Sequence, residues 1–288
     1  MMTRIAPPTE VLDSAAPLVS RVRHSPRFRM LTVARVRDLT PRMRRITLTG
    51  EDLAGFVSSG FDDHVKLFFP RPGDDEPARP AIGADGRSVW PDESRKPPSR
   101  DFTPRRYDAA AGELHIDFAL HDISLATNSG PATDWAASAR LGSQLGVGGP
   151  RGSFVISTAF DWHLLIGDET AIPAIGRRLE ELPATAHALV VMEVANAGEQ
   201  MSFTSNAAFD VTWVHRDGAR PGSIEGLERA ARALRLPPGQ GYAWVAAETA
   251  VAKQLRQTLI ERGADKRWLR AAGYWKQGAE AIHDMHDE

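Results

Sequence analysis

Apolar and polar residues alternate along the first half of the chain. The segments 65–69 and 114–121 place apolar side chains at every second position. A side-chain period of two is typical of a β-strand with one buried face. No helical periodicity interrupts this half before about residue 130. The pattern therefore predicts a small six-stranded antiparallel β-barrel, with strands over 28–38, 43–49, 65–69, 100–107, 114–121 and 144–156.

From Trp162 onward the pattern changes to continuous apolar runs that alternate with helical segments. Apolar residues recur at helical spacing in 172–179, 224–234 and 251–259, which predicts three helices. Apolar strands separated by helices are typical of a parallel sheet that is covered on both faces. We expect these strands over 163–166, 188–194, 211–214, 242–246 and 268–272.

These patterns divide the chain into three parts. We expect a flexible N-terminal segment at 1–27, a β-barrel domain at 28–158 and a parallel-sheet α/β domain at 159–288. The segment 71–99 differs from its surroundings, because it is rich in Pro, Gly, Asp and Arg and has few apolar residues. This composition predicts a long surface loop. We interpret it as an insertion; a lid over a binding site is the alternative, and the sequence leaves its role open.

The composition excludes several kinds of chemistry. The chain has no cysteine, so it has no disulfide, thiolate zinc site, cysteine-ligated iron–sulfur cluster or cysteine nucleophile. Redox chemistry would therefore need a bound organic cofactor or a metal held by other ligands. No G-x-S-x-G, Walker loop or H-E-x-x-H motif occurs. No apolar run approaches the roughly 20 residues that cross a membrane, and residues 1–17 lack a signal-peptide layout; we expect a cytoplasmic protein.

Two charged clusters raise the question of other ligands. The net charge is only −2, but residues 1–45 contain ten arginines and three acids. A solvated surface explains this cluster better than an anionic partner, and without an aromatic platform or a recognition helix we expect no nucleic-acid binding. His283 and His286 lie among acidic residues near the C-terminus, where a solvated helix end is the better interpretation than a metal site. No metal site is expected.

A flavin is the ligand that the segment Arg100-Asp101-Phe102-Thr103 suits best. The ring of a flavin needs an apolar flat neighbour and a hydrogen-bond donor, and its phosphates suit the planar fork of a guanidinium. Two later segments fit the same ligand. Gly130 and Pro131 precede a helical run, and the start of a helix binds phosphate through free N–H groups and the helix dipole. Residues 164–174 read as a strand, a turn and a helix start, which is where parallel sheets place ligands.

In this order, the motifs resemble the siderophore-interacting protein family. These proteins are FAD-dependent ferric-siderophore reductases of the ferredoxin-reductase-like superfamily. The resemblance covers roughly residues 28–280 and implies an FAD-binding barrel followed by an NAD(P)-binding-like α/β domain. The matching segments are 63–70, 100–105, 116–121, 130–136, 167–175, 244–248 and 273–278.

The resemblance implies a set of cofactor-binding residues. Arg100 would contact the FAD phosphates, Phe102 would lie against the flavin, and Thr103 would hydrogen bond near its N5 atom. Family members usually have Tyr in place of Phe102 and Gly in place of Ala247. The full expected set is Arg100, Asp101, Phe102, Thr103, Asp117, Phe118, Leu120, His121, Gly130, Pro131, Ala132, Trp135, Ala136, Asp168, Thr170, Ala171 and Trp275.

The resemblance also implies the reaction and its partners. NADH or NADPH would reduce FAD, which would reduce Fe(III) in a ferric siderophore and release Fe(II); ferredoxin is left as an alternative donor. The cofactor carries this chemistry, so no residue is assigned a catalytic proton transfer. Lys66, Arg105 and Lys276 are the candidate substrate-binding cations. Arg216 would favour binding of the 2′-phosphate of NADPH, whereas the negative charge of Glu193 would oppose it.

Two other functions stay open at this point. One is a general NAD(P)H- or ferredoxin-type flavin oxidoreductase with another acceptor, which would have the same two domains. The other is a ferric-siderophore binding protein without a redox role, which would be colourless when purified. The class of siderophore and the oligomeric state are not predicted.

Overall fold

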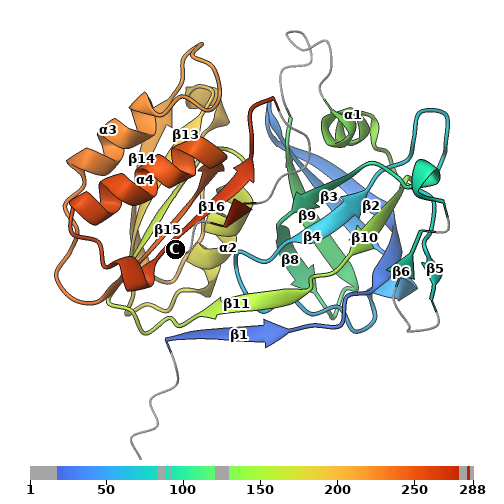
Figure 1. Ribbon diagram of the computed structural model, residues 1–288, viewed down its shortest axis with the longest axis horizontal. Helices are drawn as coiled ribbons and strands as arrows, with labels where there is room; N and C mark the ends of the chain where they lie inside the picture. The colour runs from blue at the N-terminus through green and yellow to red at the C-terminus, as the bar shows by residue number, and fades with distance from the viewer. Residues whose placement is uncertain (1–17, 84–87, 91, 121–129, 279–283, 286–288) are drawn as a thin grey trace, which may run out of the picture.

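The structure is a computed structural model that describes residues 18–83, 88–90, 92–120, 130–278 and 284–285. Two sheets lie side by side (Figure 1). The N-terminal sheet is antiparallel and has seven strands, and the C-terminal sheet is mostly parallel and has six. The predicted fold class, an antiparallel barrel-like sheet followed by a parallel-sheet α/β unit, is confirmed.

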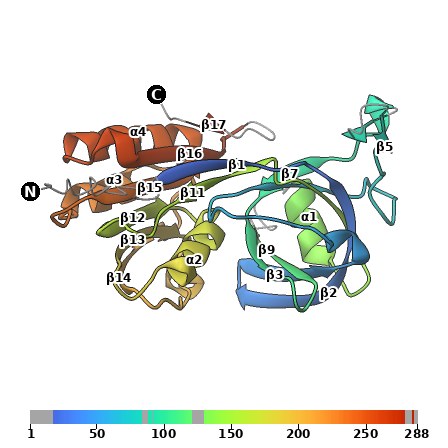
Figure 2. The same cartoon turned by 90° about the horizontal axis from the view of Figure 1, so that it is seen from below.

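The N-terminal sheet is curved around an apolar core. Alternating side chains from its strands fill this core, and Leu31, Ile46, Leu67, Ile116 and Leu145 are completely buried. Helix α1, Pro131–Ser138, lies over one end of the sheet against β9 and β7 (Figure 2). In spatial order the strands are β7 (Ser99–Phe102), β4 (Val65–Phe68), β10 (Gln144–Gly148), β2 (Phe28–Thr40), β3 (Met43–Thr49), β9 (Glu113–Ala119) and β8 (Pro104–Asp108).

Three features of this half differ from the sequence prediction. The expected strand 100–107 is divided at Thr103 into β7 and β8, which pair at opposite edges of the sheet, so the sheet has seven strands instead of six. The expected strand 144–156 is divided into β10 and β11 (Gly152–Ile156). Strand β11 leaves the sheet and pairs with β1 (Val19–Arg23). Part of the segment expected to be flexible is therefore a strand, because β11 supplies its backbone hydrogen-bond partners.

The C-terminal sheet has the strands and helices that the apolar runs predict. Its strand order places β12 at the centre, and β17 adds an antiparallel edge. Helix α2 (Ile172–Glu181) covers the face toward the N-terminal sheet, and α3 (Glu225–Ala233) and α4 (Thr249–Glu261) cover the other face. In spatial order the strands are β14 (Ala208–His215), β13 (His187–Val194), β12 (Trp162–Gly167), β15 (Gly241–Glu248), β16 (Leu269–Trp275) and β17 (Asp284–Met285).

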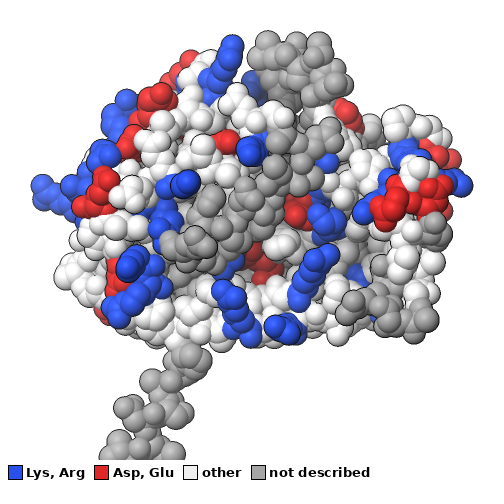
Figure 3. All heavy atoms as spheres, in the orientation of Figure 1, with Lys and Arg blue, Asp and Glu red and all other residues white. Residues whose placement is uncertain are grey.

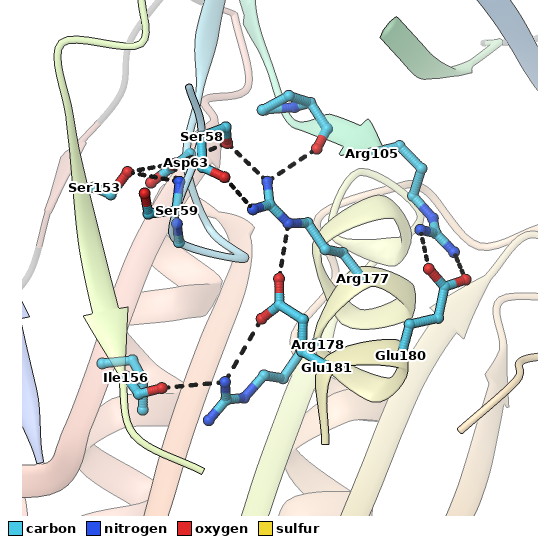
Figure 4. Close-up of polar contacts among 12 residues, drawn as sticks. Ser58, Ser59, Asp63, Arg105, Ser153, Ile156, Arg177, Arg178, Glu180 and Glu181 are labelled. Carbon is cyan, nitrogen blue, oxygen red and sulfur yellow. Dashed lines mark hydrogen bonds and ion pairs between the residues drawn. The ribbon is translucent and has the colours of Figure 1, made fainter. Parts of the chain in front are cut away.

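Helix α2 joins the two sheets through its charged residues (Figure 4). The Arg177 guanidinium donates to the Ser58 hydroxyl at 2.8 Å, to the Ser58 carbonyl at 2.8 Å and to the Pro104 carbonyl at 3.1 Å. The Arg178 guanidinium donates to the carbonyl of Ile156 at 3.2 Å. These bonds hold the second half of α2 against residues of the N-terminal half of the chain.

The described part of segment 71–99 forms an arm that projects from the N-terminal sheet (Figure 1). It contains the short strands β5 (Ala81–Ile82) and β6 (Ser88–Val89). The Trp90 ring packs on Phe28 and Phe68, with ring centroids 6.3 and 5.5 Å apart, and so anchors the arm to the sheet. No helix within the described part of the chain is long and apolar enough to span a bilayer. The remaining described elements are the 3-10 helices Glu51–Leu53, Glu93–Arg95, Ala197–Glu199 and Lys266–Trp268.

Candidate functional site

A cavity of about 210 Å³ lies between the two sheets. Strand β7, the end of β9 and the start of α1 form its walls on one side, and the start of α2 and the end of β16 form its walls on the other. Both halves of the chain are therefore needed to form it. The residues expected to bind a cofactor that line this cavity are Arg100, Asp101, Phe102, Thr103, Asp117, Gly130, Pro131, Ala132, Thr170 and Trp275.

Strand β7 supplies the flat apolar part of the cavity. The Phe102 ring is half-buried and packs on the buried ring of Phe118, with centroids 4.5 Å apart. Thr103 follows at the end of the strand and is buried, and its side chain is hydrogen bonded to Tyr274 from β16. Burial raises the pKa of the Tyr274 hydroxyl well above its ordinary value, and this bond opposes the shift. The Thr103 hydroxyl is thus held where β7 ends.

The start of α1 borders the cavity beside Arg100. Gly130 is the N-cap and has φ of 86°, a value that glycine adopts without steric cost, and the N-terminus has no side-chain cap. Pro131 occupies the first turn. A second cavity of about 770 Å³ begins here, since Arg100, Gly130 and Pro131 line both. An anion at this junction would meet a guanidinium and the positive end of a helix dipole.

The turn between β12 and α2 is held by a buried carboxylate. Asp168 is 4% exposed and accepts a 2.7 Å hydrogen bond from the Trp275 indole N–H. It also accepts bonds from the backbone N–H of Thr170 at 2.9 Å and from its hydroxyl at 2.5 Å. Burial and the neighbouring Glu169 raise the pKa of Asp168 to about 6, against the effect of these bonds. Asp168 therefore positions Trp275, whose indole lines the cavity.

Behind this turn, one arginine is shared by two acids. The Arg216 guanidinium donates two 2.6 Å hydrogen bonds to Glu169 and one of 3.1 Å to Glu193. Burial raises the pKa of Glu193 to about 7, although the bond from Arg216 opposes the shift. A third cavity of about 470 Å³ adjoins here, because Glu169 lines both this cavity and the one between the sheets.

The structure does not bring the three candidate substrate-binding cations together. Lys66 is on β4 and forms a 2.7 Å ion pair with Asp101, which lines the cavity. The Arg105 side chain is 10% exposed and forms two hydrogen bonds with Glu180 of α2, at 2.9 and 2.5 Å. Lys276 is exposed, directly after Trp275. None of the three lines the cavity between the sheets.

Several predicted cofactor residues lie next to the cavity instead of in its wall. Trp135 lines the second cavity and Leu120 the third. Phe118, Ala136 and Ala171 are buried in the cores, and Asp168 lies beneath Trp275. His121 lies outside the described residues, as do His283 and His286. Lining residues absent from the predicted set are His64, Ala119, Thr133, Glu169, Pro173 and Tyr274; all six lie inside the matching segments 63–70, 116–121, 130–136, 167–175 and 273–278, so the motifs could have identified them.

The donor set of these cavities fits FAD. A planar ring system would find aromatic neighbours in Phe102 and Trp275 and a hydroxyl in Thr103. A pyrophosphate would find Arg100 and the uncapped start of α1 at the junction with the second cavity. The second cavity leaves room for a nucleotide beyond the phosphates.

Two family profiles match the chain in succession. Residues 32–154 match the siderophore-interacting FAD-binding domain. Residues 160–278 match the siderophore-interacting protein domain. The two matches cover the curved sheet and the parallel sheet respectively.

Relatives and solved structures agree with these matches. The chain is 37% identical over 258 residues to the NADPH-dependent ferric-chelate reductase of Escherichia coli, covering 88% of this chain and 95% of that protein. It is 33% identical over 263 residues to the ferric vibriobactin reductase ViuB of Vibrio cholerae, covering 89% and 93%. The structure is similar to that of a siderophore utilization protein from T. fusca, with a TM-score of 0.83 and 39% identity over 92% of this chain and 98% of that one.

Proposed function

The chain belongs to the siderophore-interacting protein family, and from this premise we propose that it is an FAD-dependent ferric-siderophore reductase that takes its electrons from NAD(P)H. One observation carries the proposal. The cavity between the sheets combines Arg100, Phe102 and Thr103 from the first half of the chain with Thr170 and Trp275 from the second. A site built from both halves can hold a flavin and admit a nicotinamide from the side of the parallel sheet.

The protein's part in the reaction is binding and orientation. When bound, FAD supplies the conversion of a hydride from NAD(P)H into the single electrons that reduce Fe(III). Arg100 and the start of α1 hold the phosphates, Phe102 supports the ring, and Thr103 is held by Tyr274 where it can donate a hydrogen bond. Trp275, positioned by Asp168, forms part of the wall of the cavity on the side of the parallel sheet. The electron transfer itself requires no acid or base from the protein.

The substrate is a ferric siderophore. Fe(III) is a hard cation that anionic oxygen donors hold tightly, and reduction lowers its charge, so the iron leaves as Fe(II). Lys66 and Lys276 are the proposed contacts for an anionic chelate, because Lys66 is partly exposed, Lys276 is exposed, and both lie next to cavity-lining residues. We do not assign this role to Arg105, whose guanidinium is already bound by Glu180.

The remaining parts of the proposal concern setting and organisation. NADPH or NADH is the donor, with a ferredoxin as the alternative, and the reaction takes place in the cytoplasm, where these donors occur. The division into an FAD-binding domain at 28–158 and an NAD(P)H-binding-like domain at 159–288 is supported by the two separate sheets. The linker between them follows β11.

An anaerobic two-step mixing experiment tests the function. FAD-loaded protein is mixed first with NADPH or NADH and then with a panel of ferric siderophores, with a ferrous chelator present to trap Fe(II). We expect the flavin absorbance to bleach in the first step and to return in the second as Fe(II) appears. Return of colour only with quinones would indicate a general flavin oxidoreductase, and failure to bind FAD would indicate a non-redox binding protein.

A further inference from the structure

The third cavity, of about 470 Å³, lies outside the flavin site. The loops that follow β13 and β14 form one wall, and Thr40, Arg42 and Met43 at the turn between β2 and β3 form the other. The carboxyl ends of parallel strands are where open α/β sheets bind nucleotides. Glu169 lines both this cavity and the flavin cavity, so the two cavities adjoin.

Two of the three acids that line this cavity, Glu199 and Glu169, are already occupied. Glu199 accepts a 2.5 Å hydrogen bond from the Thr40 hydroxyl and a 3.0 Å bond from the backbone N–H of Arg42. Glu169 is bound through both carboxylate oxygens to Arg216. Glu193, near the end of β13, is 2% exposed and is also bound to Arg216. An acid at the end of the second strand can bind the ribose 2′-hydroxyl of NADH. In this protein that acid, Glu193, is instead bound to Arg216.

Arg216 is held in place by the same contacts. Its side chain is 5% exposed, and its ion pairs with Glu169 and Glu193 have N–O distances of 2.6 and 3.1 Å. Moving this guanidinium toward a ligand would leave Glu193 buried without its partner, which is strongly unfavourable. The sequence suggested Arg216 as the contact for a 2′-phosphate, and the structure assigns it instead to the wall of the cavity.

Arg220 differs from Arg216 both in its exposure and in its lack of an ion pair with any described residue. It is exposed, lines the cavity, and lies in the turn after β14, in which Gly218 has φ of 97°. Its guanidinium forms no ion pair with any residue that the structure describes. A guanidinium at the rim of a nucleotide cavity matches the oxygens of a phosphate group.

We propose that Arg220 binds the 2′-phosphate of NADPH in this cavity and thereby makes the protein prefer NADPH to NADH. The inference rests on the proposed function, because it assumes that a pyridine dinucleotide is the donor. The exposed Asp217 beside Arg220 is the one acid of the cavity that could instead receive the ribose hydroxyls of NADH among the residues described.

Calorimetric titration with two nucleotide fragments tests this assignment without turnover. The FAD-loaded protein is titrated with adenosine 2′,5′-bisphosphate and with 5′-AMP, which differ only in the 2′-phosphate. We expect the bisphosphate to bind at least about tenfold more tightly, the effect of one charge-assisted phosphate contact. Arg220→Ala should remove most of this difference and leave the affinity for 5′-AMP unchanged. Arg235→Ala, an exposed arginine after α3 that does not line the cavity, is the matched control.

Three outcomes would overturn the assignment. These are equal affinities for the two fragments in the unaltered protein, an unchanged difference in Arg220→Ala, and an Asp217→Asn variant that loses affinity for 5′-AMP, which would assign the cavity to NADH. Failure of the proposed function has a different signature: the protein would show the Arg220-dependent difference but would not reduce ferric siderophores.

Discussion

At the residue scale, the site depends on side chains that are fixed by one another. Asp168 orients Trp275, Thr103 is bonded to Tyr274, and Arg216 is bound by two acids. Lys66 is different, because its ion pair with Asp101 is partly exposed to water and can be exchanged for a ligand at little cost. A cation of this kind suits a substrate that must bind and leave in each cycle.

Replacement of Lys66 should therefore affect substrate binding more than turnover. We expect Lys66→Ala to raise KM for an anionic ferric siderophore by about three- to tenfold with little change in kcat, because the lost contact is made equally in the ground state and the transition state. Steady-state kinetics over a range of siderophore concentrations measure this split. Lys96→Ala, on the arm, is the control. A fall in kcat at unchanged KM would remove Lys66 from the binding role.

A buried histidine should make the stability depend on pH. His163 is completely buried in the C-terminal core, and both ring nitrogens lack a hydrogen bond to any described residue. Burial, with a smaller effect of Arg178, lowers its pKa to about 3. The unfolded chain binds a proton near the ordinary pKa of 6.5, so the stabilisation present above this value is lost as the pH falls. Between pH 7 and pH 5 we expect a loss of about 2 kcal/mol from this group.

Denaturant unfolding at several pH values tests this expectation. His163→Leu should remove the corresponding part of the pH dependence, and His187→Leu, at a more exposed position on β13, should leave it in place. An unchanged pH dependence in His163→Leu would contradict the assignment.

At the scale of elements, α2 connects the cofactor cavity to the interface between the sheets. Its start lies at the cavity, and its charged side chains contact the N-terminal sheet (Figure 4). Arg177 binds Ser58, which in turn donates a 2.8 Å bond to buried Asp63. Removing Arg177 would leave the carbonyl groups of Ser58 and Pro104 without this donor.

We expect Arg177→Ala to lower the free energy of unfolding by about 1–3 kcal/mol, the cost of leaving buried polar groups unpaired. It should also weaken FAD binding, because α2 forms a wall of the cavity. Denaturant unfolding and FAD titration measure the two effects. Arg229→Ala, at an exposed position on α3, should change neither. A loss of stability with unchanged FAD affinity would show that the contacts of Arg177 do not affect the FAD cavity.

Hydrophobic periodicity identified the strands and helices whose pattern lies within one short stretch of sequence. The five apolar runs became β12 to β16, and the three helical patterns became α2 to α4. The sequence did not predict the division at Thr103, where adjacent residues join opposite edges of one sheet, since pairing is set by distant strands. It also missed β1, because Val19–Arg23 is short and arginine-rich and is ordered by β11. For the site, motifs named most of the wall of the cavity, but the ion pair that occupies Arg105 depends on Glu180, 75 residues away.

At the scale of the whole molecule, the three cavities adjoin one another, and residues of both halves line two of them. They share Arg100 at one junction and Glu169 at the other. Basic side chains gather along the β1–β11 ladder that crosses this boundary, where Arg21 and Arg23 are exposed (Figure 3). These arginines make this part of the surface locally positive, although the net charge of the chain is −2.

Because both sheets contribute to the cavity, FAD should stabilise the whole molecule. A ligand that binds only the folded state at one hundred times its Kd raises the free energy of unfolding by about 2.7 kcal/mol. We expect the melting temperature to rise with FAD concentration, with tryptophans of both halves reporting the same transition. A rise confined to one half would indicate that the cavity is formed by that half alone.

The most direct test of the account is a titration of the apoprotein with FAD, followed by the change in FAD fluorescence. We predict saturable binding of one FAD per chain. Arg100→Ala should bind at least about tenfold more weakly, because it removes a charge-assisted phosphate contact, whereas the exposed neighbour variant Arg106→Ala should bind as the unaltered protein does. Absence of FAD binding, or equal affinity in Arg100→Ala, would contradict it.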